Sequence, residues 1–191
     1  IATPHAAKPT WGNTWQSPLW LSSQAMAVLL VWEDVPADLR DTLKTAIDSE
    51  ADRVASRPPK GYHPGDTGAE ENAWDLQAPV DALCLDPQNP HADEWWKAAR
   101  VYAMNVYSTA ADEQDDSRVG VDIVRKLVST ANLFADYTLE NHGFFHPDYV
   151  QFSGEELGEA WMALMLADQL NHTHRATAFE PYAMHHVAEV W

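Results

Sequence analysis

The sequence predicts an all-α protein whose helical hairpins form part of an (α/α) toroid. Two observations support this prediction. Apolar residues recur at helical spacing in most segments, and helices that are apolar nearly all round alternate with helices that carry charge on one face. The 191 residues fit a single domain, 1–191. A closed toroid of stacked helix pairs needs about twice this length, so we expect part of a larger toroid.

The first helix pair is expected in the N-terminal third. Ser17 before Pro18 predicts a helix start. This helix runs to about Trp32 and is apolar nearly all round, so we expect an inner, buried helix. Pro36 opens the next helix, which carries charged residues on one face and is expected to be an outer helix. Its apolar stripe consists of Leu39, Leu43, Ile47, Ala51 and Val54.

A second helix pair is expected after a loop rich in proline and glycine. Asp66 or Thr67 can cap an inner helix there, and Pro79 is expected to kink that helix or to start it again. The segment from Ala92 to about Ala111 is predicted to be a long helix that pairs with it.

The rest of the chain combines an irregular crossing with the last helices. We expect an irregular loop or a short extended segment near 119–152. Ser153 and Glu156 form a capping box, which predicts that a helix begins behind it. A last helix is expected from near Phe179 to the end of the chain.

Charge and hydrophobicity limit the partners. The formal net charge is −17, which disfavours nucleic acid and anionic membranes because both need a cationic face. No apolar run reaches the roughly 18 residues that a membrane span requires. The inner helices are too apolar to leave one side in water, so we expect the chain to pack on further helices from the same or another chain.

The cellular compartment is only weakly marked. Cys84 is the one cysteine and lies between two leucines, so it predicts a buried small hydrophobe and gives no redox information. The chain begins with Ile1, which indicates a removed leader or a piece of a longer protein. A secreted or periplasmic location is favoured over the others.

The segment 136–152 holds the side chains best suited to chemistry. Gly143 permits backbone angles closed to other residues, and Pro147 pushes His146 away from helical angles, so the segment is expected to be non-helical. That backbone argues against a helical histidine pair for zinc, and we expect no metal and no cofactor. The alternative is a structural loop whose histidines satisfy backbone groups. The polar residues of the segment 136–152 include Asn141, His142, His146, Asp148 and Tyr149.

A second cluster lies at the predicted start of the second inner helix. Glu70 or Glu71 can share a helix face with Trp74. Asn72 is a poor residue for a helix interior, and an inward-pointing asparagine has donors that can hold a carboxylate. The alternative is that the acidic residues only favour the positive end of the helix dipole.

Helical hairpins followed by asparagine, and then by an irregular segment with histidine and tyrosine, resemble the α/α-toroid polysaccharide lyases. These are the hyaluronate, chondroitin and alginate lyases and the heparinases. By position, Glu70–Trp74 is similar to their helix start with asparagine and tryptophan, and His142–Tyr149 is similar to their segment from histidine to tyrosine. Ala73 stands where a second tryptophan is usual, and the spacing from histidine to tyrosine also departs from theirs.

The resemblance implies a carbohydrate-active enzyme that cleaves a uronate-containing polysaccharide by β-elimination. Asn72 or Asn141 would neutralise the uronate carboxylate. His142 or His146 would take the C5 proton, and Tyr149 would protonate the leaving oxygen. The residues expected to bind the polysaccharide or oligosaccharide are Asn141, Glu70, Glu71, Trp74, Trp15 and Trp11, the last two as stacking surfaces.

Two alternatives stay open at this point. The first is a glycoside hydrolase on the same fold, which needs two carboxylates flanking the bond. The second is a non-catalytic helical module that binds another protein through the toroid edge. The candidate carboxylates for the hydrolase are Glu70, Glu71, Glu140 and Asp148.

Overall fold

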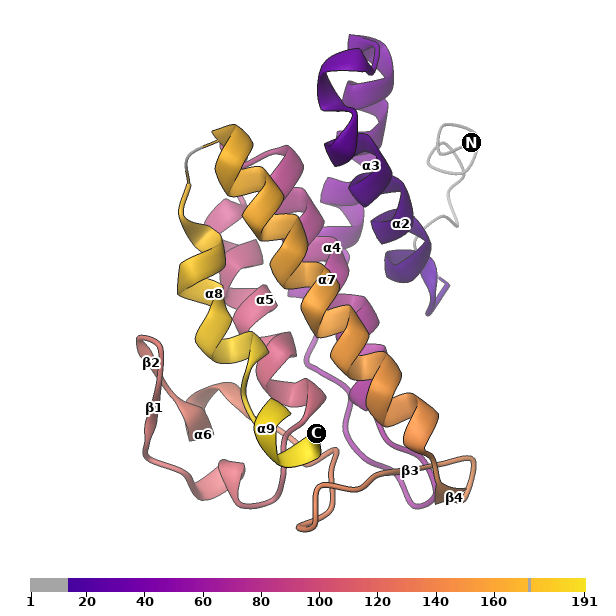
Figure 1. The fold of residues 1–191 in the computed structure, drawn as a ribbon, viewed down its shortest axis with the longest axis vertical. Helices are drawn as coiled ribbons and strands as arrows, with labels where there is room; N and C mark the ends of the chain where they lie inside the picture. The colour runs from indigo at the N-terminus through magenta and orange to yellow at the C-terminus, as the bar shows by residue number, and fades with distance from the viewer. Residues whose placement is uncertain (1–13, 172) are drawn as a thin grey trace.

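The computed structural model describes residues 14–171 and 173–191, and Trp11 lies outside this part. The described chain is mostly helical, which confirms the all-α class (Figure 1). The helices are α2 (Ser17–Leu30), α3 (Ala37–Ala55), α4 (Ala69–Leu85), α5 (Ala92–Val106), α6 (Val124–Leu127), α7 (Pro147–Asn171), α8 (Arg175–Ala183) and α9 (Val187–Val190). The 3-10 turns are η1 (Trp32–Asp34) and η2 (Asp112–Gln114). A closed toroid stays a prediction.

Two short antiparallel hairpins are the extended structure of the described chain. The strands are β1 (Arg118–Val119) with β2 (Asp122–Ile123), and β3 (Glu140–Asn141) with β4 (Phe144–Phe145). They lie in or beside 119–152, where an irregular or extended segment is predicted. None of the described helices is long and apolar enough to cross a membrane.

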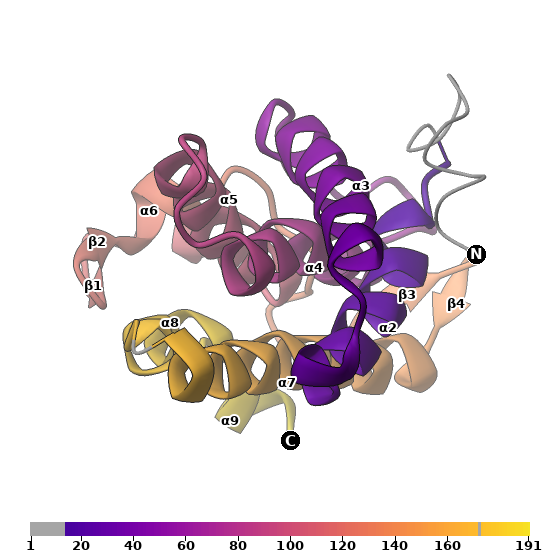
Figure 2. The same ribbon diagram turned by 90° about the horizontal axis from the view of Figure 1, so that it is seen from above.

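Helix α4 is the centre of the packing (Figure 2). It contacts α2, α3, α5 and α7, and every residue of it except Glu71 is buried. The second inner helix is therefore found where the sequence predicts it. The sequence predicts that Pro79 either kinks this helix or starts a new one. The helix continues through Pro79, so no new helix starts there. Its N-cap is Gly68, and Thr67 Oγ1 accepts a hydrogen bond from the Ala69 N–H at 3.2 Å.

Helix α2 is not the buried inner helix that the sequence predicts. Leu21, Ala25 and Leu29 are buried, but Trp20 is 45% exposed and Leu30 is 66% exposed. Burial on every side needs neighbours on every side, and α2 lies at the edge of the helices with contacts to α3, α4 and α7. The packing of further helices on this surface stays a prediction.

Helices α3 and α5 follow the sequence prediction with shifted ends. Four of the five predicted stripe residues of α3 are buried, whereas Leu39 is 51% exposed. Helix α5 ends at Val106 rather than near Ala111. The carbonyl oxygen of Ser108 accepts the N–H groups of Asn132 and Leu133, both at 2.8 Å, so the crossing segment takes the place of another helical turn.

Helix α7 begins at Pro147, so the prediction of a non-helical stretch through residue 152 is wrong. Proline suits the first position of a helix, because its missing N–H has no partner there in any case. The predicted capping box is also wrong. Ser153 lies within the helix, and its Oγ donates to the Tyr149 carbonyl oxygen at 2.7 Å. Tyr149 therefore stands on the first turn of a long helix.

The last helix is divided in two, although the sequence predicts one. His186 has φ 58° and ψ 6°, in the left-handed region, and this separates α8 from α9. A right-handed helix cannot continue through such a residue.

Buried asparagines join the loops around the N-terminus of α4. Asn72 Nδ2 donates to the carbonyl oxygens of Lys60 at 2.9 Å and Asn105 at 3.1 Å, and its Oδ1 accepts the Lys60 N–H at 2.8 Å. Asn132 Nδ2 donates to the same two carbonyl oxygens, at 3.2 Å and 2.6 Å, and its Oδ1 accepts the Gly68 N–H at 2.9 Å. The two amides thus bind one shared pair of backbone carbonyls.

Asn105 extends this network to the crossing segment. Its Nδ2 donates to the Leu127 carbonyl oxygen at 2.8 Å, and its Oδ1 accepts the Ser129 N–H at 3.0 Å. Asn72 and Asn105 have no exposed surface, and Asn132 is 2% exposed. The "asparagine network" of Asn72, Asn105 and Asn132 therefore fixes the loops against α4 and α5 with hydrogen bonds that water cannot replace.

Asn72→Ala is expected to destabilise the fold. It removes three hydrogen bonds and leaves the Lys60 N–H without its partner, whereas the carbonyl oxygens of Lys60 and Asn105 keep the amide of Asn132. We expect the free energy of unfolding in urea to fall by about 2–4 kcal/mol, because each lost hydrogen bond contributes about 1 kcal/mol and an unsatisfied buried group costs roughly 1–3 kcal/mol. Asn171→Ala is the control, since it removes one 3.2 Å bond from an exposed residue and should cost less than about 1 kcal/mol. Equal losses in the two variants would contradict this account.

Candidate functional site

A pocket of about 490 Å³ lies between α4, the first turns of α7 and the residues just before α2. It joins three segments that are distant in the sequence. Its lining residues are Trp15, Gln16, Trp74, His146, Asp148, Tyr149 and Phe152. A concave site with aromatic walls and a few polar groups is the usual form of a small-molecule site.

Trp74 is the centre of the aromatic wall. Its ring centroid lies 5.0 Å from that of Trp15 and 5.7 Å from that of Phe152. Trp15 is 52% exposed, so the wall reaches the surface. The indole Nε1 of Trp74 is buried and has no hydrogen-bond partner among the described residues, although buried indole N–H groups normally find one. The wall thus offers flat apolar faces of the kind on which sugar rings stack.

A histidine–tyrosine pair stands at the rim of this wall. His142 Nε2 lies 3.2 Å from the Tyr149 hydroxyl oxygen, within hydrogen-bond distance. The ring of His146 lies 4.3 Å from that of Tyr149 and is nearly perpendicular to it, at 88°. His146 Nδ1 is buried and has no partner in the described part of the chain. Two imidazoles and one phenol therefore meet at one place.

The turn of the β3–β4 hairpin places His142. His142 has φ 55° and Gly143 has φ 83°. Two consecutive residues with positive φ form the type I′ turn that suits a two-residue hairpin loop. Gly143 accepts this conformation without cost, whereas for His142 it is unusual. The Gly143 N–H donates to the Gly65 carbonyl oxygen at 2.8 Å, which fixes the turn against the loop before α4.

The strands of the hairpin are held from the side of α4. Asn141 is buried, and its Nδ2 donates to Glu70 Oε1 at 2.9 Å. The Glu140 carboxylate accepts the Tyr62 hydroxyl and the Gly65 N–H, the latter at 2.8 Å. These contacts hold the hairpin in position, so His142 does not depend on its own turn alone to reach Tyr149.

The surroundings of Tyr149 keep its hydroxyl protonated. Burial is the largest cause that raises its pKa above the ordinary value, followed by the negative charges of Glu70, Asp66 and Glu71. A protonated hydroxyl can donate to His142 Nε2 when that nitrogen carries no proton. Tyr149 is therefore suited to give a proton rather than to take one.

Glu70 is a buried carboxyl group with an unusual charge state. Burial raises its pKa to about 7, and the charges of Glu71 and Asp66 act in the same direction, against the hydrogen bond from Asn141. Its Oε2 atom is buried without a partner among the described residues. Near neutral pH the group is therefore divided between the neutral and the ionised form.

The structure brings together some of the residues that the sequence singles out. Trp15, Trp74, His142, His146 and Tyr149 converge at or beside the pocket.

Asp148, a candidate carboxylate, also lines the pocket. The other predicted residues are bound by protein partners or lie outside the described residues. Asn72 has no exposed surface, and its amide is used by the asparagine network. Glu71 forms an ion pair with Lys60, and Asn141 is occupied by Glu70. Trp11 lies outside the described residues. Neither asparagine is therefore free in this structure to receive a uronate carboxylate.

We did not identify from the sequence two groups of residues that the structure places at candidate sites. Phe152 and Gln16 line the pocket, and Phe152 would have been found by reading α7 from Pro147, since it lies one helical turn from Asp148. The second set, Asp112, His185 and His186, places two imidazoles and a carboxylate close enough for one metal ion. Adjacent histidines were its signal in the sequence.

Comparison with protein-family models, curated proteins and solved structures gives no match for this chain. The function is therefore inferred from the geometry of the site.

The free energy of unfolding is expected to depend on pH through Glu70. Its pKa rises from 4.5 to about 7 on folding, so between these values the folded chain binds more protons than the unfolded chain. Stability is then lost as pH rises through this window. Glu70→Gln keeps an acceptor for Asn141 but cannot ionise. Its stability relative to the wild type should increase by about 1–3 kcal/mol between pH 4.5 and pH 7.5. Urea unfolding at both pH values measures this, and a constant difference would refute it.

Proposed function

We propose that this chain carries the active site of a polysaccharide lyase that cleaves a uronate-containing glycan by β-elimination. The observation that carries the proposal is the 3.2 Å contact between His142 Nε2 and the Tyr149 hydroxyl beside the wall of Trp15 and Trp74. β-Elimination needs one group that takes the C5 proton and one that protonates the leaving oxygen, and this pair offers both.

The two roles follow from the local electrostatics. Imidazole is the side chain best suited to take a proton near neutral pH, so His142 acts as base. The raised pKa of Tyr149 keeps its proton available for the leaving oxygen. The C5–H and C4–O bonds break, and a C4=C5 double bond forms. The proton on His142 then returns to the tyrosinate along their hydrogen bond, which restores both groups. His146 is the second candidate base, because its ring also contacts Tyr149.

The charge of a uronate sets a condition on this site. Asp148 lines the pocket, and Glu71 and Asp66 lie near enough to affect Tyr149, so a second anion is repelled unless some charge is removed. The raised pKa of Glu70 removes part of that charge when it protonates near or below pH 7. Lys60 Nζ lies 6.0 Å from the centroid of the Trp15 ring, but its charge is already paired with Glu71. Substrate binding is therefore favoured on the acidic side of pH 7.

A glycoside hydrolase is the second candidate. Glu70 has the raised pKa of about 7 that suits a general acid, and Asp148 lines the adjoining pocket. Glu71 and Glu140 have other partners, Lys60 and Tyr62. Glu70 is 4% exposed, and this burial favours the lyase over a hydrolase, in which both carboxyl groups must reach the bond.

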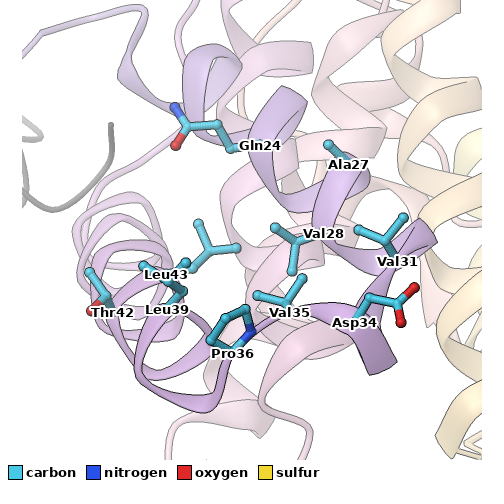
Figure 3. Close-up of a pocket in the computed structure, with 10 residues that line it drawn as sticks. All are labelled: Gln24, Ala27, Val28, Val31, Asp34, Val35, Pro36, Leu39, Thr42 and Leu43. Atoms are coloured by element: carbon cyan, nitrogen blue, oxygen red, sulfur yellow. The ribbon is translucent and has the colours of Figure 1, made fainter.

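A non-catalytic interaction module is the third candidate, and an apolar groove supports it. Figure 3 shows this groove between the C-terminal half of α2, the turn after it and α3. Its volume is about 500 Å³. The groove is lined by Gln24, Ala27, Val28, Val31, Asp34, Val35, Pro36, Leu39, Thr42 and Leu43. A protein that acts only through this groove would bind a partner and leave glycans intact.

Incubation of the chain with uronate polymers tests the lyase proposal, because β-elimination leaves an unsaturated product that absorbs in the ultraviolet. Tyr149→Phe and His142→Ala are each expected to lower the rate by on the order of 10²–10⁴-fold, as loss of an acid or base does. The thermal transition should stay in place, since both side chains stand at the rim of the fold.

Tyr182→Phe is the matched control. It removes a tyrosine hydroxyl that donates to Asp122 Oδ2 at 2.9 Å, away from the pocket and the β3–β4 hairpin, and should leave the rate within a few-fold. Sugar release without the absorbance would replace the lyase by the hydrolase. An unchanged rate in Tyr149→Phe would remove this residue from the mechanism.

A further inference from the structure

A second cluster of reactive side chains lies where the C-terminal segment meets η2. His185 Nε2 lies 3.2 Å from Asp112 Oδ1, and His186 Nε2 lies 3.0 Å from both carboxylate oxygens. One ligand atom from each of the three residues lies within 4.8 Å of the other two. Two nitrogens and one carboxylate thus converge from segments that are distant in the sequence.

The backbone of the C-terminal segment is bent so that both rings face one carboxylate. Side chains of consecutive residues in a helix point in different directions. Here His186 adopts the left-handed conformation, with φ 58°, and the ring centroids of His185 and His186 lie 4.0 Å apart. A histidine in this conformation is uncommon and costs free energy, and such residues concentrate at functional sites.

The carboxylate is held in a fixed orientation. Asp112 is 3% exposed, and its Oδ2 accepts the Thr109 N–H at 2.7 Å and the Thr109 hydroxyl at 2.9 Å. On the other side, His186 Nδ1 lies 3.8 Å from a Glu189 carboxylate oxygen. This distance is longer than a hydrogen bond, so Glu189 adds negative charge beside the ring without fixing its orientation.

We propose that Asp112, His185 and His186 bind one Zn²⁺ ion. Ligand atoms at zinc distances of about 2.0–2.1 Å in a tetrahedron lie roughly 3.3 Å apart. The contacts of 3.0–3.2 Å between the carboxylate and the two rings are close to that spacing, so small rotations admit the ion. The histidine side chains are 15% and 16% exposed, which leaves a path from solvent.

The charges around the cluster are those that a cation would balance. Among the described residues, Asp112 lies within salt-bridge distance of the two histidines and of no lysine or arginine. Glu189 adds a second carboxylate beside His186. Metal binding needs both imidazoles in the neutral form, and in that state a bound Zn²⁺ balances the two carboxylates. The ion would join η2 to the segment between α8 and α9 and hold the C-terminal end of the chain in place.

Calorimetric titration of EDTA-treated full chain with Zn²⁺ tests the proposal. The wild type is expected to bind one tight ion per chain and to show a higher thermal midpoint with zinc than without it. Asp112→Asn, which keeps the shape of the side chain, should weaken that event by roughly 100-fold or more, since even residues that support ligands contribute 10–100-fold. His185→Ala should do the same and replaces Asp112→Asn if that variant does not fold.

His91→Ala is the matched control. His91 Nδ1 lies 2.8 Å from Asp52 Oδ1, so the variant removes an exposed histidine–aspartate pair of the same chemistry outside the cluster. It should keep the tight event and the zinc-dependent rise of the midpoint. A tight event that survives in Asp112→Asn and His185→Ala, or a wild type without one, would overturn the proposal and leave the cluster as a hydrogen-bonded ion pair.

Discussion

A helix buried on every side must satisfy its polar side chains within the protein, because water cannot reach them. Helix α4 is such a helix, and the arrangement of its neighbours follows from this constraint. Four of its polar side chains take a partner from another element. Asn141 binds Glu70, the Lys60 backbone binds Asn72, Arg57 binds Asp75, and Glu156 binds Gln77. The loop before α4, the β3–β4 hairpin and α7 are therefore positioned by specific hydrogen bonds as well as by apolar packing.

The candidate site depends on the same constraint. The bond from Asn141 to Glu70 places the hairpin, and the hairpin turn places His142 at Tyr149. Tyr149 stands on α7, which Gln77 anchors by donating to the Glu156 carbonyl oxygen at 2.7 Å. This arrangement requires a buried carboxyl group, and burial raises the pKa of Glu70 to about 7. The protonation of Glu70 therefore affects both the free energy of unfolding and the charge near His142 and Tyr149.

The sequence predicts the helices better than it predicts their surroundings. The stripe of α3 and the apolar length of α4 are local patterns, and both helices are found where they are expected. The exposure of α2 depends on which neighbours surround it, which no local pattern reports. Asn72 is unusual for a helix, as the sequence shows, but its partners lie in loops distant in the chain. The cluster at Asp112 is marked in the sequence only by its adjacent histidines, because the carboxylate that joins them comes from a segment distant in the chain.

The central claim is that the pocket beside His142 and Tyr149 binds a uronate saccharide. NMR of the indole N–H groups during titration with a uronate oligosaccharide tests it most directly, because tryptophans lie both in the pocket and far from it. The account predicts that the Trp15 and Trp74 signals shift, while that of Trp96, which packs against Phe179, stays in place. Shifts confined to Trp96 or to Trp32 beside the α2–α3 groove, or no shifts at all, would contradict it.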